Sequence, residues 1–150
     1  QDAQQGRAMA DALLDRVEQM IPSEFKLIPG KGFGEAPEPG EAYWLSLGKV
    51  HLWRSIWMFR DLDASKVSDN QRQEKQTSAI LNLIEAVAYF HRYDETRSYP
   101  LQRTLRYFSD FIQRHHIPTD RVRKLINEFT EKYLIDLKVL FEAADDMLGV

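Results

Sequence analysis

The chain of 150 residues contains no cysteine, and this absence excludes several kinds of chemistry. Without thiols there is no disulfide framework, no thiolate ligand for a metal and no cysteine nucleophile. The Gly-x-Ser-x-Gly elbow of hydrolases and the complete Walker pattern of phosphate-binding loops are also missing. These absences favour a protein that is not an enzyme, and the sequence assigns no catalytic residue, no metal ligand and no cofactor.

Long apolar runs are missing as well. The most apolar window, residues 43–59, is interrupted by Lys49, His51 and Arg54, whereas a membrane-spanning helix needs about 18 to 20 apolar residues in a row. We therefore expect no membrane span. The net charge of −3 is too small to predict a partner, and the start at Gln1 fits a trimmed chain as well as a processed one. We expect a cytoplasmic protein.

Glycine and proline are scarce except in residues 22–40, which hold four of the seven glycines and four of the six prolines. We predict a long Pro/Gly-rich connector there. Its Gly-Lys-Gly-Phe-Gly run at 30–34 is similar to part of a phosphate-binding loop, but Glu35 occupies the place of the third glycine of the dinucleotide fingerprint. A connector is therefore the preferred interpretation.

Apolar residues in the rest of the chain recur every three or four positions, without the alternation typical of strands. The sequence therefore predicts an all-α, single-domain bundle of about five helices over residues 1–150. In chain order we expect a frayed N-terminus at 1–7, a first helix at 8–21, the connector at 22–40, a central helix at 41–62, further helices at 71–93 and 100–116, and a long C-terminal helix from 120 to about 148.

The central helix carries all three tryptophans and is apolar on nearly every side, so it needs neighbours all around it. One interpretation is a buried middle helix, in which the small or polar strip of Gly48, His51 and Ser55 lets another helix approach. The other leaves the face with Trp44, His51 and Met58 open to another protein or to a second copy of the chain. The candidate partner-binding residues are Trp44, His51, Trp53, Trp57 and Met58.

None of the four histidines has another histidine three or four residues away on a helix, and no glutamate lies three residues before any of them. His91 and His115 lie on the apolar stripes of their helices, and we expect them to be hydrogen-bonded at the edge of the core. The alternative interpretation pairs them with Glu85 or Asp110 across a helix interface. They would then line a pocket for a small ligand, a metal or acid–base chemistry.

Residues 92–124 contain eight basic and four acidic residues. Arg103, Arg106 and Arg114 share the polar face of one predicted helix and are candidates for binding an anion. Asp110 lies four residues from both Arg106 and Arg114, so it would weaken a positive stripe there. Nucleic-acid binding through this region is therefore only a third hypothesis.

The leading hypothesis is a non-enzymatic helical module for protein–protein interaction, such as an adaptor, an inhibitor or a small accessory subunit. It depends on the missing catalytic spacings and on the plentiful aromatic surface of the central helix. The second hypothesis is a helical bundle that binds a small ligand, or acts as an enzyme, near His91 and His115.

Overall fold

The computed structural model describes residues 2–33, 41–64, 66–93 and 99–137, and within them the regular elements are all helical. This confirms the predicted all-α fold with five helices. None of the described helices carries an apolar stretch long enough for a membrane crossing. The elements are α1 (Asp2–Met20), a 3₁₀ turn η1 (Ser23–Phe25), α2 (Glu41–Ala64), α3 (Asp69–Tyr93), α4 (Tyr99–Arg114) and α5 (Thr119–Tyr133).

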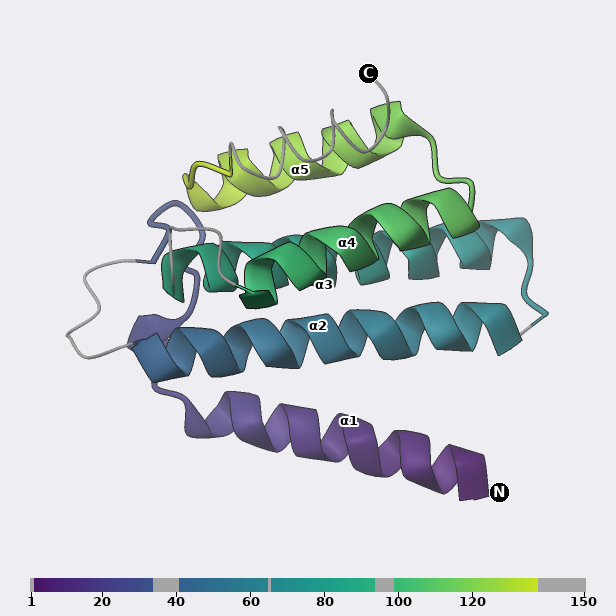
Figure 1. Cartoon of the computed structure of the whole chain (residues 1–150), viewed down its shortest axis with the longest axis horizontal. Coiled ribbons are helices and arrows are strands. Elements are labelled where there is room, and N and C mark those ends of the chain that lie inside the picture. The colour runs from purple at the N-terminus through teal and green to yellow at the C-terminus, as the bar shows by residue number, and fades with distance from the viewer. Residues whose placement is uncertain (1, 34–40, 65, 94–98, 138–150) are drawn as a thin grey trace.

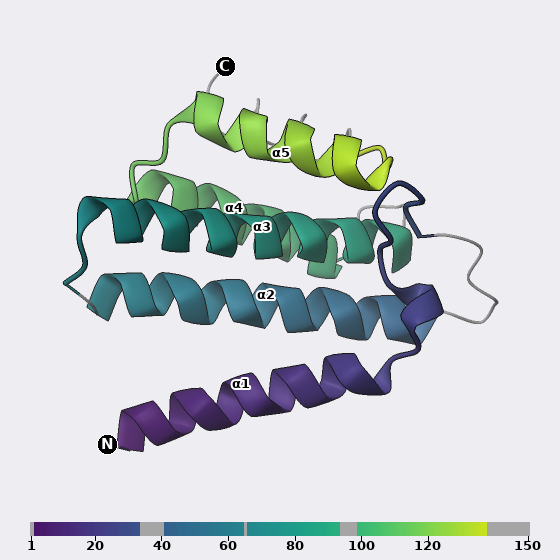
Figure 2. The same ribbon diagram turned by 180° about the vertical axis from the view of Figure 1, so that it is seen from behind.

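Consecutive helices run in opposite directions and stack side by side (Figures 1 and 2). The middle of the stack is formed by α2 and α3, which pack against each other along most of their length. The first helix, α1, lies at one edge against α2, and α5 lies at the opposite edge. The remaining helix, α4, lies in front of α3 in Figure 1 and behind it in Figure 2.

Two groups of buried apolar side chains hold this stack together. The larger group lies between α2, α3, α4 and α5 and includes the fully buried Phe59, Phe90 and Ile126. The smaller group joins η1 to α2 and α3 through Phe25 and Trp44. Since a fully buried side chain of this size contributes about 1.5–3 kcal/mol, the larger group dominates the stability of the fold.

The first helix contributes almost nothing to either group, because no residue from 4 to 20 is buried. An amphipathic helix normally turns its apolar stripe towards the core, but here the stripe faces solvent. Its members, which we call the α1 stripe, are Met9 (66% exposed), Leu13 (61%), Val17 (40%) and Met20 (75%).

The prediction of a frayed N-terminus at 1–7 is wrong for residues 2–7, because α1 begins at Asp2. Arg7 explains the difference. Its guanidinium pairs with Asp11 one turn later, and its Nε donates to Asp61 Oδ2 of α2 at 3.2 Å. The first turns of α1 are therefore attached to the neighbouring helix.

The connector predicted at 22–40 is described up to residue 33, and its last part, 34–40, lies outside the described residues. The described part is a set of tight turns. Gly30 and Gly32 have φ values of +77° and +65°, which favour glycine, and Gly30 N donates to Lys132 O at 2.8 Å. Residues 30–33 of the run thus form a turn packed on the end of α5.

The prediction of one continuous C-terminal helix up to about residue 148 is wrong, because α5 ends at Tyr133. Leu134 adopts a left-handed conformation (φ 54°, ψ 47°) and its N–H donates to Thr130 O, which caps the helix. The chain then turns back so that Leu137 is buried in the larger core group. Residues 138–148 of the predicted helix lie outside the described residues.

The predicted strip of Gly48, His51 and Ser55 faces the interior, where all three residues are buried. A Cβ built on Gly48 would lie only 2.4 Å from Cε1 of Phe90 on α3. Phe90 is itself almost completely buried, so its ring has little room to move. Gly48 therefore allows the close approach between α2 and α3.

We predict that Gly48→Ala lowers the free energy of unfolding by about 1–3 kcal/mol, because the added methyl group overpacks the core. Gly6→Ala is the matched control, since nothing lies within 4 Å of its ideal Cβ. In α1, alanine is the better helix former by about 1 kcal/mol, so the control should be neutral or stabilising. Urea denaturation of both variants measures this, and equal effects would contradict the account of Gly48.

Candidate functional site

A polar cluster around the buried His51 joins α1, α2 and α3, and we call it the His51 cluster. It consists of Glu18 from α1, His51 from α2, and Asn82 and Glu85 from α3. His51 Nε2 lies 2.9 Å from Glu85 Oε2 and 3.4 Å from Glu18 Oε2, while Nδ1 lies 2.9 Å from Asn82 Oδ1. The imidazole is 6% exposed, and both carboxylates approach the same ring nitrogen, Nε2.

The hydrogen bonds of Asn82 indicate the protonation of His51. Asn82 Nδ2 donates to Ser78 O at 3.0 Å and approaches Met58 Sδ at 3.6 Å, so its carbonyl oxygen is the group that faces the imidazole. Nδ1 must then donate to this oxygen, and Nε2 donates to the carboxylates. Both ring nitrogens carry a proton, which makes His51 an imidazolium.

The pKa values follow this geometry. Burial lowers the pKa of His51, but the hydrogen bonds to Glu18 and Glu85 outweigh it and raise the pKa from 6.5 to about 9. For Glu18, the hydrogen bond to His51 and the pairing with Arg54 outweigh burial and lower the pKa to about 2. A histidine that is protonated at neutral pH is a poor general base, so the cluster is suited to holding helices together.

Arg54 completes the contact between α1 and α2. Its guanidinium donates to both carboxylate oxygens of Glu18, at 3.0 and 3.1 Å, and to Asp15 Oδ1 at 2.8 Å. This two-pronged arrangement fixes direction as well as distance. Together with the His51 cluster, it turns the charged side of α1 towards α2.

The five candidate partner-binding residues of the central helix do not share an exposed face. Trp44 (3% exposed) and His51 are buried, so the expectation that they remain open to a partner is wrong. Arg92 covers the ring of Trp44 at 4.4 Å. Trp53, in contrast, is 46% exposed.

Trp57 and Met58 are half-buried, and α1 runs alongside them. The guanidinium of Arg7 lies 5.3 Å from the centre of the Trp57 ring. Trp53 precedes Trp57 by one helical turn, so both indoles lie on the same side of α2. The exposed indole therefore lies on the same side of α2 as Trp57.

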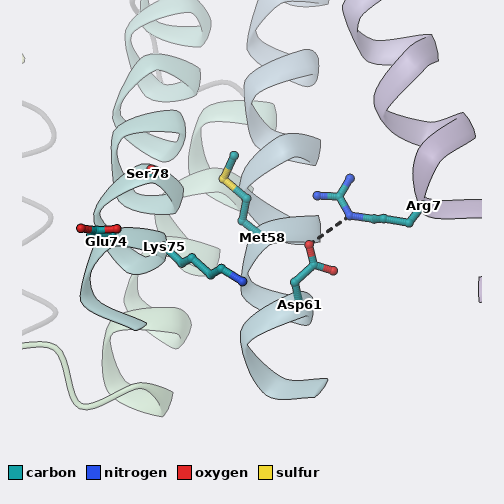
Figure 3. Close-up of a pocket in the computed structure, with 6 residues that line it drawn as sticks. All are labelled: Arg7, Met58, Asp61, Glu74, Lys75 and Ser78. Carbon is teal, nitrogen blue, oxygen red and sulfur yellow. Dashed lines mark hydrogen bonds and ion pairs between the residues drawn. The ribbon is translucent and has the colours of Figure 1, made fainter. Parts of the chain in front are cut away.

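A charged cleft of about 400 Å³ lies between α1, α2 and α3 (Figure 3). Arg7 and Asp61 form an ion pair across it, and the side chain of Lys75 reaches towards α2 in the same view. The lining combines two bases with two acids, so its charges compensate one another. The residues are Arg7, Met58, Asp61, Glu74, Lys75 and Ser78.

The candidate anion-binding arginines are only partly brought together. Arg103 and Arg106 line a hollow of about 310 Å³ on α4, together with Asp110. Arg103 also donates to Tyr107 Oη at 3.1 Å. Arg114 lies outside this hollow and pairs with Asp63 of α2 at 3.8 Å. The expected pairing of Arg114 with Asp110 is not seen among the described residues.

His91 and His115 are not brought into one pocket. Both lie near the C-terminal ends of their helices, and α3 and α4 are antiparallel (Figure 1), so the two histidines lie at opposite ends of the bundle. His115 Nε2 lies 3.4 Å from Asp63 Oδ1, and burial lowers the pKa of His115 despite this carboxylate. Glu85, which was considered as a partner of these two histidines, contacts His51. No group of three potential ligands suited to a metal ion occurs within the described ranges.

The sequence did not identify the α1 stripe as a candidate binding surface. The spacing of its residues predicts a helix but does not say which side is covered. A signal was available on α2, where Arg54 lies between Trp53 and Ser55 in the most apolar window of the chain. A partly buried arginine needs carboxylate partners, and Asp15 and Glu18 on α1 could have supplied them.

The His51 cluster predicts how stability depends on pH. Because the folded pKa of about 9 lies above the ordinary value of 6.5, the stabilisation is complete below pH 6.5 and is lost as the pH rises through 9. We expect the free energy of unfolding to fall by up to about 3 kcal/mol across this range.

Urea denaturation from pH 6 to 9.5 measures this dependence. His51→Gln should remove this part of the pH dependence, and Glu18→Gln, which keeps the imidazole but removes one carboxylate charge, should reduce it. An identical pH dependence in all three proteins would contradict the assignment of an imidazolium.

The chain was compared with protein families, curated proteins and solved structures. No protein-family model, no curated protein and no solved structure matches the chain.

Proposed function

We propose that the protein is a non-catalytic helical module that binds another polypeptide chain. The binding surface is the α1 stripe, and the exposed indole of Trp53 on α2 is a second candidate contact. One observation carries this proposal: α1 turns its charged side towards its own bundle and its apolar side towards solvent.

The α1 stripe is a continuous surface. On a helix with about 100° per residue, Met9, Leu13, Val17 and Met20 fall within about 80° of one another. Isolated exposed apolar residues are common on proteins, but contiguous apolar patches mark interaction sites. Burial of one such side chain in an interface stabilises the complex by roughly 1.5–3 kcal/mol.

The side chains of this surface are of the kinds enriched at the centres of protein interfaces. Methionine adapts its shape to a partner, and tryptophan is a frequent hot-spot residue. On α2, Trp53 presents a large exposed aromatic ring. The ring of Trp57 is partly covered, because the guanidinium carbons of Arg7 and Arg60 lie 5.3 and 5.2 Å from its centre.

The ion pairs between α1 and α2 support the proposal because they orient the stripe. If α1 were attached through its apolar residues, a partner would find only charged side chains. Attachment through Glu18, Arg54 and Arg7 leaves the apolar residues available. The cost of burying these charges is offset only by several well-formed hydrogen bonds, which the His51 cluster and Arg54 supply.

Nucleic-acid binding through residues 92–124 is less well supported. Several of the basic residues there already make contacts within the chain. Arg121 donates to Gln76 Oε1 and Thr77 Oγ1 of α3, at 2.9 and 2.7 Å, Arg92 covers Trp44, and Arg114 pairs with Asp63. These contacts reduce the number of described cations that are available for phosphates, and binding of phosphates needs a net positive surface.

Photo-crosslinking tests the proposal. A photoreactive phenylalanine analogue at position 13 should form a covalent adduct with a polypeptide in cells that express the chain. The same residue at position 19, which is exposed on α1 but outside the stripe, should form far less. Equal yields at the two positions, or no adduct at position 13, would contradict the proposal.

A further inference from the structure

We infer that α1 is a hinged arm, which opens away from α2 at Ile21–Pro22 while the rest of the bundle stays folded, and which ion pairs hold in the closed position. The inference goes beyond the proposed function, because it concerns how α1 is attached to its own bundle and not what binds to it. It is carried by the face that α1 turns inward, by the ion pairs across that face and by the joint at the end of the helix.

The face that α1 turns towards α2 holds little apolar surface. Its half-buried residues are Arg7, Ala10, Leu14 and Glu18, and no residue from 4 to 20 is buried. One alanine and one leucine are therefore the apolar side chains of this face. Segments with few buried apolar contacts open at a lower free energy than the core of a protein, so α1 can leave α2 without disturbing the larger core group.

The contacts that hold α1 in place are ion pairs, which we call the α1–α2 ion pairs. Near the start of α1, Arg7 Nε donates to Asp61 Oδ2 at 3.2 Å. Near its end, Arg54 Nη2 donates to Asp15 Oδ1 at 2.8 Å and to Glu18 Oε1 at 3.0 Å. These side chains are between 17% and 62% exposed. Water therefore competes for them, and such pairs separate at a smaller cost than buried ones.

The joint lies between α1 and the 3₁₀ turn η1. Ile21 and Phe25, on either side of it, are buried in the smaller core group, so the joint itself stays attached to α2 and α3. Pro22 has no N–H to donate, and among the described residues no backbone hydrogen bond links α1 to a residue beyond Ile21. Hinges are typically formed by a few residues of this kind at the end of an element, where φ and ψ can change.

Opening changes the charge of the α2 surface beneath the arm. In the closed position Glu18 contacts both Arg54 and His51, and Asp15 contacts Arg54. When α1 leaves, the guanidinium loses both carboxylates, and the imidazolium keeps only the carboxylate of Glu85. The closed arm therefore shields a cationic face of α2, and the open arm uncovers it.

The free end of α1 moves farthest when the arm opens. Gln5 lies about 24 Å from Ile21 along the helix axis, so a rotation of roughly 30° moves it by about 12 Å. Asn70, in the first turn of α3, lies at the same end of the bundle as the start of α1 (Figures 1 and 2). Both residues are exposed and can carry a label without disturbing the core.

Double electron–electron resonance between spin labels at Gln5→Cys and Asn70→Cys tests the arm in the otherwise cysteine-free chain. The ion-pair variant combines Arg7→Gln with Arg54→Gln and so removes both cations of the α1–α2 ion pairs. It should show a second, longer distance in at least about one molecule in ten, the upper range of a minor conformation.

The matched control combines Arg16→Gln on α1 with Arg60→Gln on α2. Both arginines are exposed and lie outside the α1–α2 ion pairs, so the control removes the same charge from the same two helices. It should keep the single distance of the unaltered chain. The same distances in the ion-pair variant and in the control would overturn the inference.

A second pair of labels tests the hinge. Glu24 is an exposed residue of η1, and the distance between Glu24→Cys and Asn70→Cys should be single and unchanged in the ion-pair variant. A longer or broadened distance there would overturn the hinge at Ile21–Pro22, because η1 or the bundle would then move with α1. The purified chain is measured without a partner, so failure of this inference leaves the crosslinking test of the proposed function unaffected.

Discussion

The attachment of α1 to the bundle depends on charges, and this constraint shapes the rest of the molecule. Arg54 and His51 of α2 both contact the carboxylate of Glu18, and Glu85 of α3 contacts the same nitrogen of His51, Nε2. Ion pairs of this kind fix orientation better than apolar contacts, because hydrogen bonds are directional. Their net contribution to stability is smaller than the contact distances suggest, since each charge loses water when it is buried.

The two parts of the protein are therefore stabilised by different physical means. Helices α2 to α5 share a close-packed apolar core with Phe59 and Ile126 at its centre, which should respond little to salt or pH. The first helix is held mainly by polar contacts that depend on protonation and ionic strength. A helix that is oriented by charges can present its apolar side outward, and this is the physical basis of the proposed binding surface.

The sequence predicted the parts of the fold that depend on local patterns. The helix at 41–62 was found from its apolar residues and is observed as α2 at Glu41–Ala64. The end of α5 was missed, because the left-handed Leu134 is followed by tertiary contacts of Leu137 with the core. The helical start at Asp2 was missed as well, because it depends on the pairing of Arg7 with Asp61 on another helix.

The candidate site was harder to predict, for the same reason. His51 was noted as part of a polar strip, but Glu18 and Glu85 are distant from it in the sequence, and only the packing of three helices brings them together. Trp44 was expected on an open face because periodicity could not show that η1 and Arg92 cover it. Likewise, the spacing of Met9 and Leu13 revealed a helix but not which side of it faces water.

The central claim is that α1 turns its charged side inward and its apolar stripe outward. Thiol labelling of the cysteine-free chain tests it directly, by comparing Leu13→Cys on the stripe with Leu14→Cys on the side facing α2, in dilute native solution. The account predicts that the thiol at position 13 reacts at nearly the rate of an unfolded peptide and at least tenfold faster than that at position 14. A faster reaction at position 14 would contradict it.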